Sequence, residues 1–308
     1  TSHVPCINSL VVQKSRLLYL GSATVKTDES IEVYCFIDKD ADVIDYGIER
    51  ADNIRGPYMV LGRIPKPTGG PWAVKFSDYG ASPNSNRYYY RVTSQDSCGA
   101  IDTISNIGRN ILLSVRANGN LTNTLTWNPY EEWMGVVEKY EVYRQVDNNG
   151  AWTLVTDQLG ANDTSFVDNI RPFGEGTGAF CYYVRAVEGG NPLGFLDEFG
   201  LPFSSQSNNA CVTHDARIFV PSAFNPNSDV AENRIWKPSN VFARANSYEL
   251  FIMNRWGEKV FQTTNTEEGW DGNYQSKEQP MGVYTYYIKY RSLEGVPIEE
   301  RGSFTLVR

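Results

Sequence analysis

Cysteine thiols offer the most evident chemistry in this sequence. The 308 residues hold five of them, which are Cys6, Cys35, Cys98, Cys181 and Cys211. We expect Cys181 and Cys211 on neighbouring antiparallel strands, where cross-strand Cβ atoms lie about 4.5–5.5 Å apart and are near enough to adapt to a disulfide. A Cys181–Cys211 disulfide is therefore predicted, and it would fit an oxidising compartment.

The odd number of cysteines means that one is free or pairs outside this sequence. Cys6 would be the counterpart of Cys211, closing a module that precedes the sequence, or else Cys98 reaches Cys6. Cys35 takes the place that Trp127 has in the internal repeat described below. A buried free thiol is therefore expected at Cys35.

Other catalytic chemistry finds little support. The two histidines, His3 and His214, are far apart in sequence, and no Cys-x-x-Cys pair exists, so a zinc site is not predicted. Neither a Gly-x-Ser-x-Gly sequence nor a glycine-rich phosphate loop occurs. Adjacent glutamates would point to opposite faces of a strand, so their pairs make no obvious acid–base dyad. We predict that the chain is not an enzyme.

Calcium is the one cofactor that the sequence makes conceivable. Asp229 and Glu232 could bind it together with neighbouring asparagine oxygens, since calcium prefers oxygen ligands from loops. An ordinary polar turn explains the same residues, and we favour that interpretation. No metal and no other cofactor is therefore expected.

Residues suited to protein recognition form a turn near the C-terminus. Asn254, Arg255, Trp256 and Gly257 follow an expected strand at 248–253, and Arg and Trp are residue types that anchor interfaces. Core packing of Trp256 is the alternative, because its bulk favours burial.

The last strand is a second candidate contact surface. Its residues Phe304, Leu306, Val307 and Arg308 stand at the end of the sequence. A strand in such a position can lie at a sheet edge, where free N–H and C=O groups pair with a partner.

Strands must position all of these residues. Aromatic side chains make up 13% of the chain, and they pack well on a pleated surface, whereas long helical patterns are lacking. Two stretches, 9–113 and 114–216, repeat one pattern of about seven strands each. Matching positions are Tyr46 and Tyr140, Ile48 and Val142, Arg50 and Arg144, Asp78 and Asp168, and Tyr88 and Tyr182.

Both stretches resemble fibronectin type III modules. The resemblance rests on the buried Trp127 of an early strand and on the Tyr-x-Val-x-Ala strand at 182–186. It implies two β-sandwiches, and it implies little about function, because this fold hosts many roles. The apolar loop at 188–206 marks a partner surface or folds back over its own sandwich, and we favour the second interpretation.

The last stretch, 217–308, resembles the gliding motility-associated C-terminal domain of Bacteroidetes, also called the type B sorting domain of the type 9 secretion system. The resemblance rests on five motifs in order: FVPSAF at 219–224, NRWGE at 254–258, GWDG at 269–272, GVYTY at 282–286 and GSFTLVR at 302–308. The family usually has an Asp-rich turn with two glycines after its first Phe. Both glycines are absent here, which argues against ion binding in that turn.

This resemblance implies a folded address label that the secretion machinery recognises and carries across the outer membrane. The implied partners are the shuttle barrel PorV, the SprA translocon and a PorP/SprF-type membrane protein. The chain would then be secreted and lie at the cell surface, with the two sandwiches as a stalk or spacer. Alternatives are an adhesin or glycan-binding module and the accessory domains of an upstream enzyme.

Composition sets further limits. The net charge of −8 argues against nucleic-acid binding, which normally needs a basic face. No apolar run approaches the roughly 20 residues of a membrane-spanning helix, and no signal peptide is recognisable at the start. A cytoplasmic protein or a piece of a longer secreted protein would explain this, and we prefer the second.

The expected architecture is all-β, with three immunoglobulin/fibronectin III-like sandwiches in a row. Residues 1–8 are interpreted as the remnant of a preceding module. The boundaries predicted after it are 9–113, 114–216 and 217–308.

Overall fold

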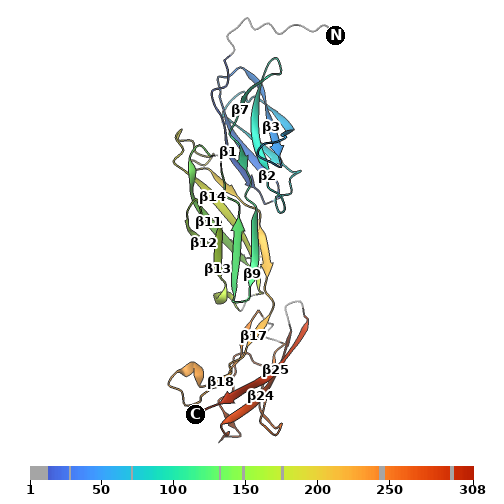
Figure 1. Cartoon of the computed structure of the whole chain (residues 1–308), viewed down its shortest axis with the longest axis vertical. Helices are drawn as coiled ribbons and strands as arrows, with labels where there is room; N and C mark the ends of the chain where they lie inside the picture. The colour runs from blue at the N-terminus through green and yellow to red at the C-terminus, as the bar shows by residue number, and fades with distance from the viewer. Residues whose placement is uncertain are drawn as a thin grey trace. The chain divides into compact units, whose positions relative to one another are not determined.

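Strands make up nearly all of the regular structure (Figure 1). The structure, a computed structural model, describes residues 13–27, 29–70, 72–131, 133–147, 150–174, 177–242, 247–291 and 295–308. In these ranges the only helices are two 3-10 turns, η1 (Arg171–Phe173) and η2 (Ala231–Asn233). None is long and apolar enough to cross a membrane. The expected all-β fold class is confirmed, whereas the interpretation of residues 1–8 falls outside the described ranges.

The chain divides into two compact units. The first comprises Thr1–Gln145, Ala151–Asp168 and Cys181–Cys211. The second comprises Val146–Gly150, Asn169–Phe180 and Val212–Arg308.

The first sandwich consists of two antiparallel sheets. The smaller sheet has the order β1 (Leu18–Val25), β2 (Ile31–Ile37), β5 (Ala73–Asp78). The larger sheet has the order β4 (Met59–Pro65), β3 (Val43–Ala51), β6 (Tyr89–Asp96), β7 (Ile101–Ile104), and β8 (Gly108–Arg109) also pairs with β6. Alternate apolar side chains of both sheets form one core, because successive residues of a strand face opposite sides.

The next strands repeat this arrangement. Their smaller sheet has the order β13 (Ser165–Asn169), β10 (Thr122–Trp127), β9 (Leu113–Asn118). Their larger sheet has the order β12 (Thr153–Leu159), β11 (Val136–Val146), β14 (Ala179–Gly189), β15 (Ser204–Gln206), and β16 (Ala210–Thr213) also pairs with β14. In both copies the first, second and fifth strands form one sheet. The predicted repeat and its fibronectin III-like fold are therefore confirmed.

Equivalent asparagines hold the first strand of each copy. Asn106 accepts a hydrogen bond from the Leu20 amide (2.8 Å) and donates one to the Leu20 carbonyl (3.0 Å). Asn208 does the same with Leu113, at 2.7 and 3.1 Å. Each side chain thus replaces a neighbouring strand at one residue, which satisfies buried backbone groups.

The strand register confirms one detail of the repeat. Leu20 lies opposite Cys35, and Leu113 lies opposite Trp127. Cys35 is free and fully buried, as predicted. Burial raises the pKa of its thiol.

A buried ion pair recurs in both copies. Arg50 pairs with Asp78 (2.7 Å), and the Tyr90 hydroxyl donates to the same carboxylate (2.8 Å). In the second copy Asp168 accepts from Arg144 (2.7 Å) and from the Tyr182 hydroxyl (2.8 Å). Tyr90 is therefore the structural equivalent of Tyr182. The match of Tyr88 to Tyr182 was wrong, because the loop before β6 differs in length from the loop before β14.

The loop between β14 and β15 packs on the first sandwich and not on its own. Phe203 is 2% exposed, and its ring centroid lies 5.5 Å from that of Phe36 and 5.7 Å from that of Tyr34. Phe195 stacks on Phe36 at 4.7 Å. The expectation that this loop covers its own sandwich was wrong, because the Phe195 and Phe203 rings pack on the aromatic side chains of β1 and β2.

Polar contacts complete this junction. The Tyr19 hydroxyl donates to Glu188 (2.6 Å), which is 2% exposed and also accepts from the Gly135 amide (3.0 Å). Trp133 Nε1 donates to the Gly21 carbonyl at 2.7 Å. Burial and the bond to Glu188 raise the pKa of Tyr19. The two sandwiches are thus joined by satisfied, buried contacts within one compact unit.

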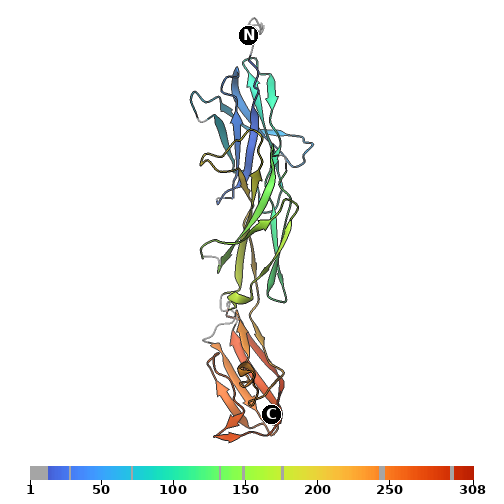
Figure 2. The same cartoon turned by 90° about the vertical axis from the view of Figure 1, so that its left-hand side faces the viewer.

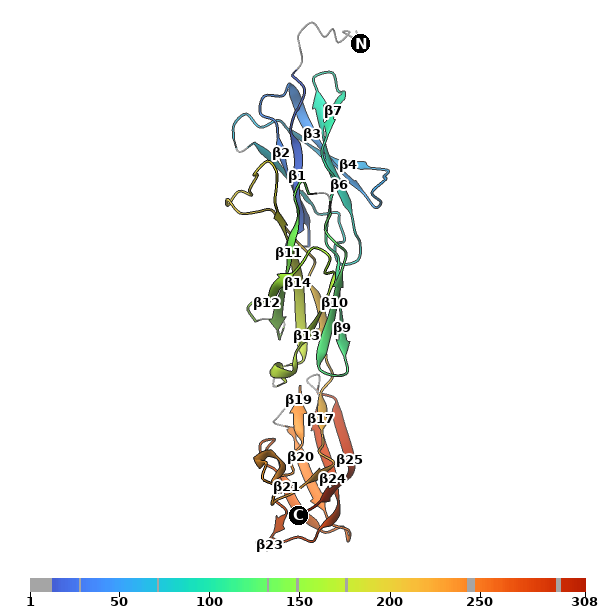
Figure 3. The same cartoon turned by 60° about the vertical axis from the view of Figure 1, so that its left-hand side comes forward.

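The C-terminal part has a five-stranded sheet, whose strands Figures 2 and 3 show side by side. Its order is β18 (Ala223–Phe224), β25 (Pro297–Leu306), β24 (Gly282–Arg291), β20 (Glu249–Met253), β21 (Lys259–Thr263). Two short pairs accompany it, β17 (Arg217–Phe219) with β19 (Ser239–Val241) and β22 (Asn273–Tyr274) with β23 (Lys277–Glu278). This is consistent with a third sandwich.

Aromatic side chains fill the core under this sheet. Phe304 stacks on Trp236 with a centroid distance of 3.9 Å, and Trp270 lies 4.8 Å from Tyr284. The backbones of Trp236 and Trp270 exchange two hydrogen bonds of 2.8 and 2.9 Å. The core therefore joins both long strands to the loops that precede them.

Two phenylalanines of one loop make a matched test of the junction. We expect Phe203→Ala to destabilise the first compact unit by about 3 kcal/mol, because it leaves a cavity among packed rings. Phe199→Ala, at a side chain that is 79% exposed, should stay within about 0.5 kcal/mol of the wild type. Denaturant unfolding of the full chain measures both, and equal effects would contradict the packing described.

Candidate functional site

The turn between β20 and β21 is held in one conformation by Asn254. The Asn254 Oδ1 atom accepts hydrogen bonds from the backbone amides of Trp256 (3.0 Å) and Glu258 (3.1 Å). The backbone carbonyl of Asn254 accepts a third from the Gly257 amide (3.0 Å). Gly257 has a φ of 79°, which glycine adopts without strain. Such side-chain bonds are the reason that Asn favours turns. The predicted turn is therefore present and is rigidly built.

Trp256 points into solvent and is 74% exposed. The Arg255 guanidinium lies over its ring, 4.7 Å from the centroid, which is a cation–π distance. Of the two alternatives for Trp256, the exposed one is observed. The turn thus displays a large apolar ring and a cation together.

Two further apolar side chains lie beside this turn. Met281 and Val283 are 61% and 60% exposed, and they line a small pocket with Arg255 and Trp256. Sequence reasoning missed both residues. The alternation in β24 was the signal available, since it places Val283 on the face opposite the buried Tyr284.

Part of the contact surface predicted for the last strand was wrong. Phe304 and Leu306 are 2% and 0% exposed and belong to the core. The end of β25 lies between β24 and β18, since Thr305 pairs with Ala223 and Leu306 with Phe224 in parallel. Phe304 and Leu306 therefore offer no contact to a partner, because alternation turns them inward and β18 covers this end of the strand.

The two final residues differ from each other. Val307 is 41% exposed. The Arg308 guanidinium donates to the carbonyl of Gln279 (2.6 Å) and approaches that of Gly272 (3.5 Å). Gln279 lines the pocket beside Trp256. Arg308 thus supports the wall of that pocket and leaves Val307 as the exposed side chain of the strand end.

A family model matches this part of the chain. Residues 218–306 match the CHU_C Type IX secretion signal domain. They form a type IX secretion signal domain. A signal of this kind indicates a protein that is exported through the type IX secretion system. The matched region includes the turn at 254–257 and the pocket beside it.

Solved structures resemble the chain only loosely. The FN1–FN3 domains of chicken CNTN1 are 11% identical with a TM-score of 0.26, over 96% of this chain and 99% of that one. A two fibronectin type III domain segment from chicken tenascin has the same identity and TM-score, over 66% and 100%. The fibronectin III-like fold of the two sandwiches is evident from their strand order. No curated protein matches the chain.

The turn that follows β18 in the secretion signal domain carries the calcium candidates. Asp229 and Glu232 are both exposed. Among the described residues, no group of three or more His, Cys, Asp or Glu side chains could hold a metal ion. Glu232 instead lines a groove of about 480 Å³ with Ile235 and Lys237. The expectation of an ordinary polar turn stays a prediction.

The predicted disulfide is present in the second sandwich. Cys181 and Cys211 are joined at an S–S distance of 2.04 Å, and their Cα atoms are 4.0 Å apart. Cys98 is disulfide-bonded as well. The predicted alternatives for Cys6 lie outside the described residues.

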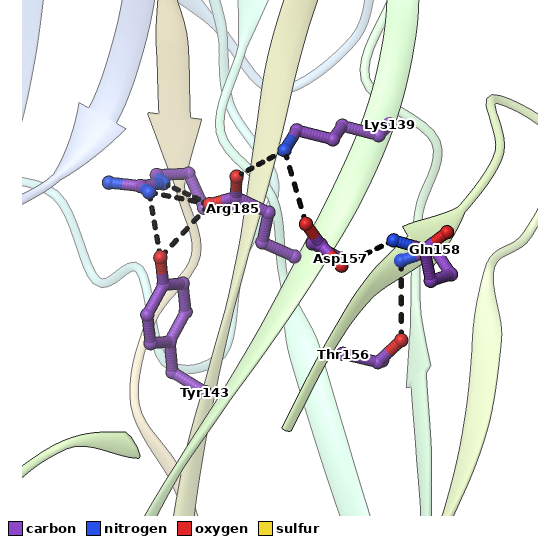
Figure 4. Close-up of polar contacts among 7 residues, drawn as sticks. Lys139, Tyr143, Thr156, Asp157, Gln158 and Arg185 are labelled. Atoms are coloured by element: carbon purple, nitrogen blue, oxygen red, sulfur yellow. Dashed lines mark hydrogen bonds and ion pairs between the residues drawn. The ribbon is translucent and has the colours of Figure 1, made fainter. Parts of the chain in front are cut away.

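A polar cluster lies on the side of β11 and β14 that faces away from the core (Figure 4). Glu141, which is 7% exposed, accepts hydrogen bonds from Arg185 (2.8 Å) and Tyr143 (3.0 Å) and pairs with Lys139 (2.9 Å). Burial acts to raise the pKa of Glu141, but the bonds from Lys139 and Arg185 outweigh it and lower the pKa overall. The cluster therefore stabilises the ionised carboxylate.

The aromatic rings beside this cluster cover one another. Tyr143 stacks on Tyr183 at 4.6 Å, and Trp152 meets the Tyr183 ring at 4.7 Å. A sugar-binding platform needs ring faces that are open and coplanar. This row of rings is therefore a packing feature, and it gives no support to glycan binding.

The Glu141 cluster predicts a pH dependence. Because the pKa of Glu141 is lower in the folded chain, its contribution is present above its unfolded pKa, about 4.3, and is lost as pH falls through the folded value. We expect Glu141→Gln to weaken the first compact unit at pH 7 and to reduce its loss of stability on acidification. Denaturant unfolding between pH 7 and 3 measures this. Glu267→Gln, which removes one partner of an exposed ion pair, is the control. Identical stability–pH profiles of the wild type and Glu141→Gln would refute the predicted role of Glu141.

Proposed function

We propose that this chain is the C-terminal region of a secreted cell-surface protein whose last domain is read by the type IX machinery. The observation that carries the proposal is the exposed, rigid turn at Arg255 and Trp256 on the domain that matches the secretion signal family. The proposed partners are the outer-membrane shuttle barrel PorV, the SprA translocon and a PorP/SprF-type membrane protein. The proposed source is a gliding member of the Bacteroidetes.

The physical basis is docking of a preformed surface. Trp and Arg are the residue types that most often dominate binding energy, above all where they sit near the centre of an interface. Asn254 and Gly257 fix the turn before any partner arrives, so little conformational entropy is lost on binding. A folded turn of this kind distinguishes the signal from a linear peptide tag.

The two sandwiches are proposed as a spacer. Phe195 and Phe203 join them through buried aromatic contacts, and Glu188 and Trp133 add buried hydrogen bonds. A pair joined in this way resists bending, which suits a stalk. The Cys181–Cys211 disulfide suits an oxidising compartment.

No catalytic role and no cofactor form part of the proposal. The chain would act by binding alone. Accessory domains of an upstream enzyme remain the alternative use of the same modules, and the secretion signal serves either kind of cargo. A glycan-binding role gains no support from Tyr143, Trp152 and Tyr183 of the second sandwich, because these rings cover one another.

Export of the full chain tests the proposal. A signal peptide and a fluorescent protein are placed before residue 1, and the fusion is expressed in a gliding bacterium that has the type IX system. We expect the fusion at the cell surface, and we expect it in the periplasm both in a translocon-deficient strain and after deletion of 218–306. The matched control is Phe199→Ala, which changes an exposed ring outside the signal domain. Surface display without the translocon, or periplasmic retention of the intact chain, would refute the proposal.

A further inference from the structure

The sheet of the secretion signal domain has one open face. Leu250 and Ile252 of β20 are fully buried, so the residues between and after them point the opposite way. The strand register places the outward residues of β20, β24 and β25 next to one another. We give the name outer face to seven of them, Phe251, Met253, Val283, Thr285, Tyr287, Arg301 and Ser303. Glu249, Lys289 and Glu299 continue the same side of the sheet toward the other end of the strands.

The outer face is apolar at its centre and continuous with the turn. Met253, Thr285 and Tyr287 line a depression of about 550 Å³, and the Phe251 and Tyr287 rings stack at 6.3 Å. Val283 also lines the small pocket that contains Trp256. The turn at 254–257 and the outer face therefore form one surface.

Three positive charges lie beside this apolar centre. Lys259 Nζ lies 4.4 Å from the Phe251 ring centroid, Arg255 lies over Trp256, and Arg301 lines the depression. In the described parts of the chain, no salt bridge includes any of these three cations. Their charges are available in a chain whose net charge is −8.

Acidic residues of the same sheet lie mainly at the far end of this side, where the Glu299 carboxylate forms a hydrogen bond with Tyr287. Glu249 and Glu299 are both opposite Lys289, which is at the other end of the register from Val283. Glu258 accepts a hydrogen bond from Asn254 within the turn. At the end beside Trp256, Arg255 and Lys259 outnumber Glu258, and this is therefore the positive end.

We infer that the outer face and the turn form one docking surface, and that its partner is a protein surface with an apolar centre and carboxylates around it. This inference rests on the proposed function and specifies the chemistry of the partner. Aromatic residues, Met and Arg are enriched in protein interfaces, and the outer face with its turn combines all three. Charge complementarity then selects an acidic partner and speeds its encounter.

A charge series at Arg255 tests the inference in the full chain. The initial rate of surface display is measured for Arg255→Lys, Arg255→Gln and Arg255→Glu, and for Trp256→Ala. For an acidic partner we expect the display rate of Arg255→Lys to stay near that of the wild type. The rate should fall by roughly threefold in Arg255→Gln and by roughly tenfold or more in Arg255→Glu. Trp256→Ala should fall by about tenfold or more, as for a central interface tryptophan. The display rate of the double variant Lys259→Glu, Arg301→Glu should fall as much as that of Arg255→Glu.

Matched variants elsewhere in the domain are the controls. Lys237→Glu makes the same charge change beside the groove of Ile235, and Phe219→Ala removes a ring that is 47% exposed. Both should be displayed like the wild type. All variants should keep the wild-type melting temperature, which separates a docking defect from misfolding.

Each other outcome decides against the inference in a different way. Translocon-independent display of the wild type would refute the proposed function itself. Normal wild-type export with equal rates for Arg255→Lys, Arg255→Gln and Arg255→Glu would overturn the acidic partner alone. Binding of the full chain to vesicles of anionic lipid, lost in Arg255→Glu and Trp256→Ala, would replace the protein partner by a membrane surface.

Discussion

The packing of Phe304 against Trp236 is the contact on which the C-terminal domain depends. It joins the last strand, β25, to a loop near the start of the domain, and the parallel pairing of β18 with β25 acts in the same place. Residues near both ends of the domain therefore belong to one core. The proposed docking surface therefore depends on this core, and loss of the core would remove that surface as a whole.

The side chains proposed for docking are exposed because strand alternation turns only every second residue into the core. β24 turns Tyr284 and Ile288 inward, which leaves Val283, Thr285 and Tyr287 on the open side of the sheet. An exposed apolar face is normally unfavourable, and this is the physical ground for the docking role proposed for it together with Trp256 and Arg255. The same alternation that builds the sheet thus also builds the proposed docking surface.

The two sandwiches share a buried polar group and differ in the residues through which they contact each other. Both retain the buried arginine–aspartate–tyrosine group, for which the partners must be complete because an unpaired buried charge is very costly. They differ where one must meet the other. Only the second has the loop that carries Phe195 and Phe203. The first has Gly21 at the point of contact, where a Cβ atom would lie only 2.7 Å from the Phe203 ring.

The sequence by itself determined the features that depend on local patterns. Alternation indicated the strands, the Asn254–Gly257 turn followed from its residue types, and the neighbouring strands of Cys181 and Cys211 indicated their disulfide. Tertiary structure alone decided three matters: that β18 covers the end of β25, that the loop of Phe203 packs on the other sandwich, and that Tyr90 is the equivalent of Tyr182. Each depends on which distant segments pair, and that choice is made by the total surface buried, which no short stretch of sequence records.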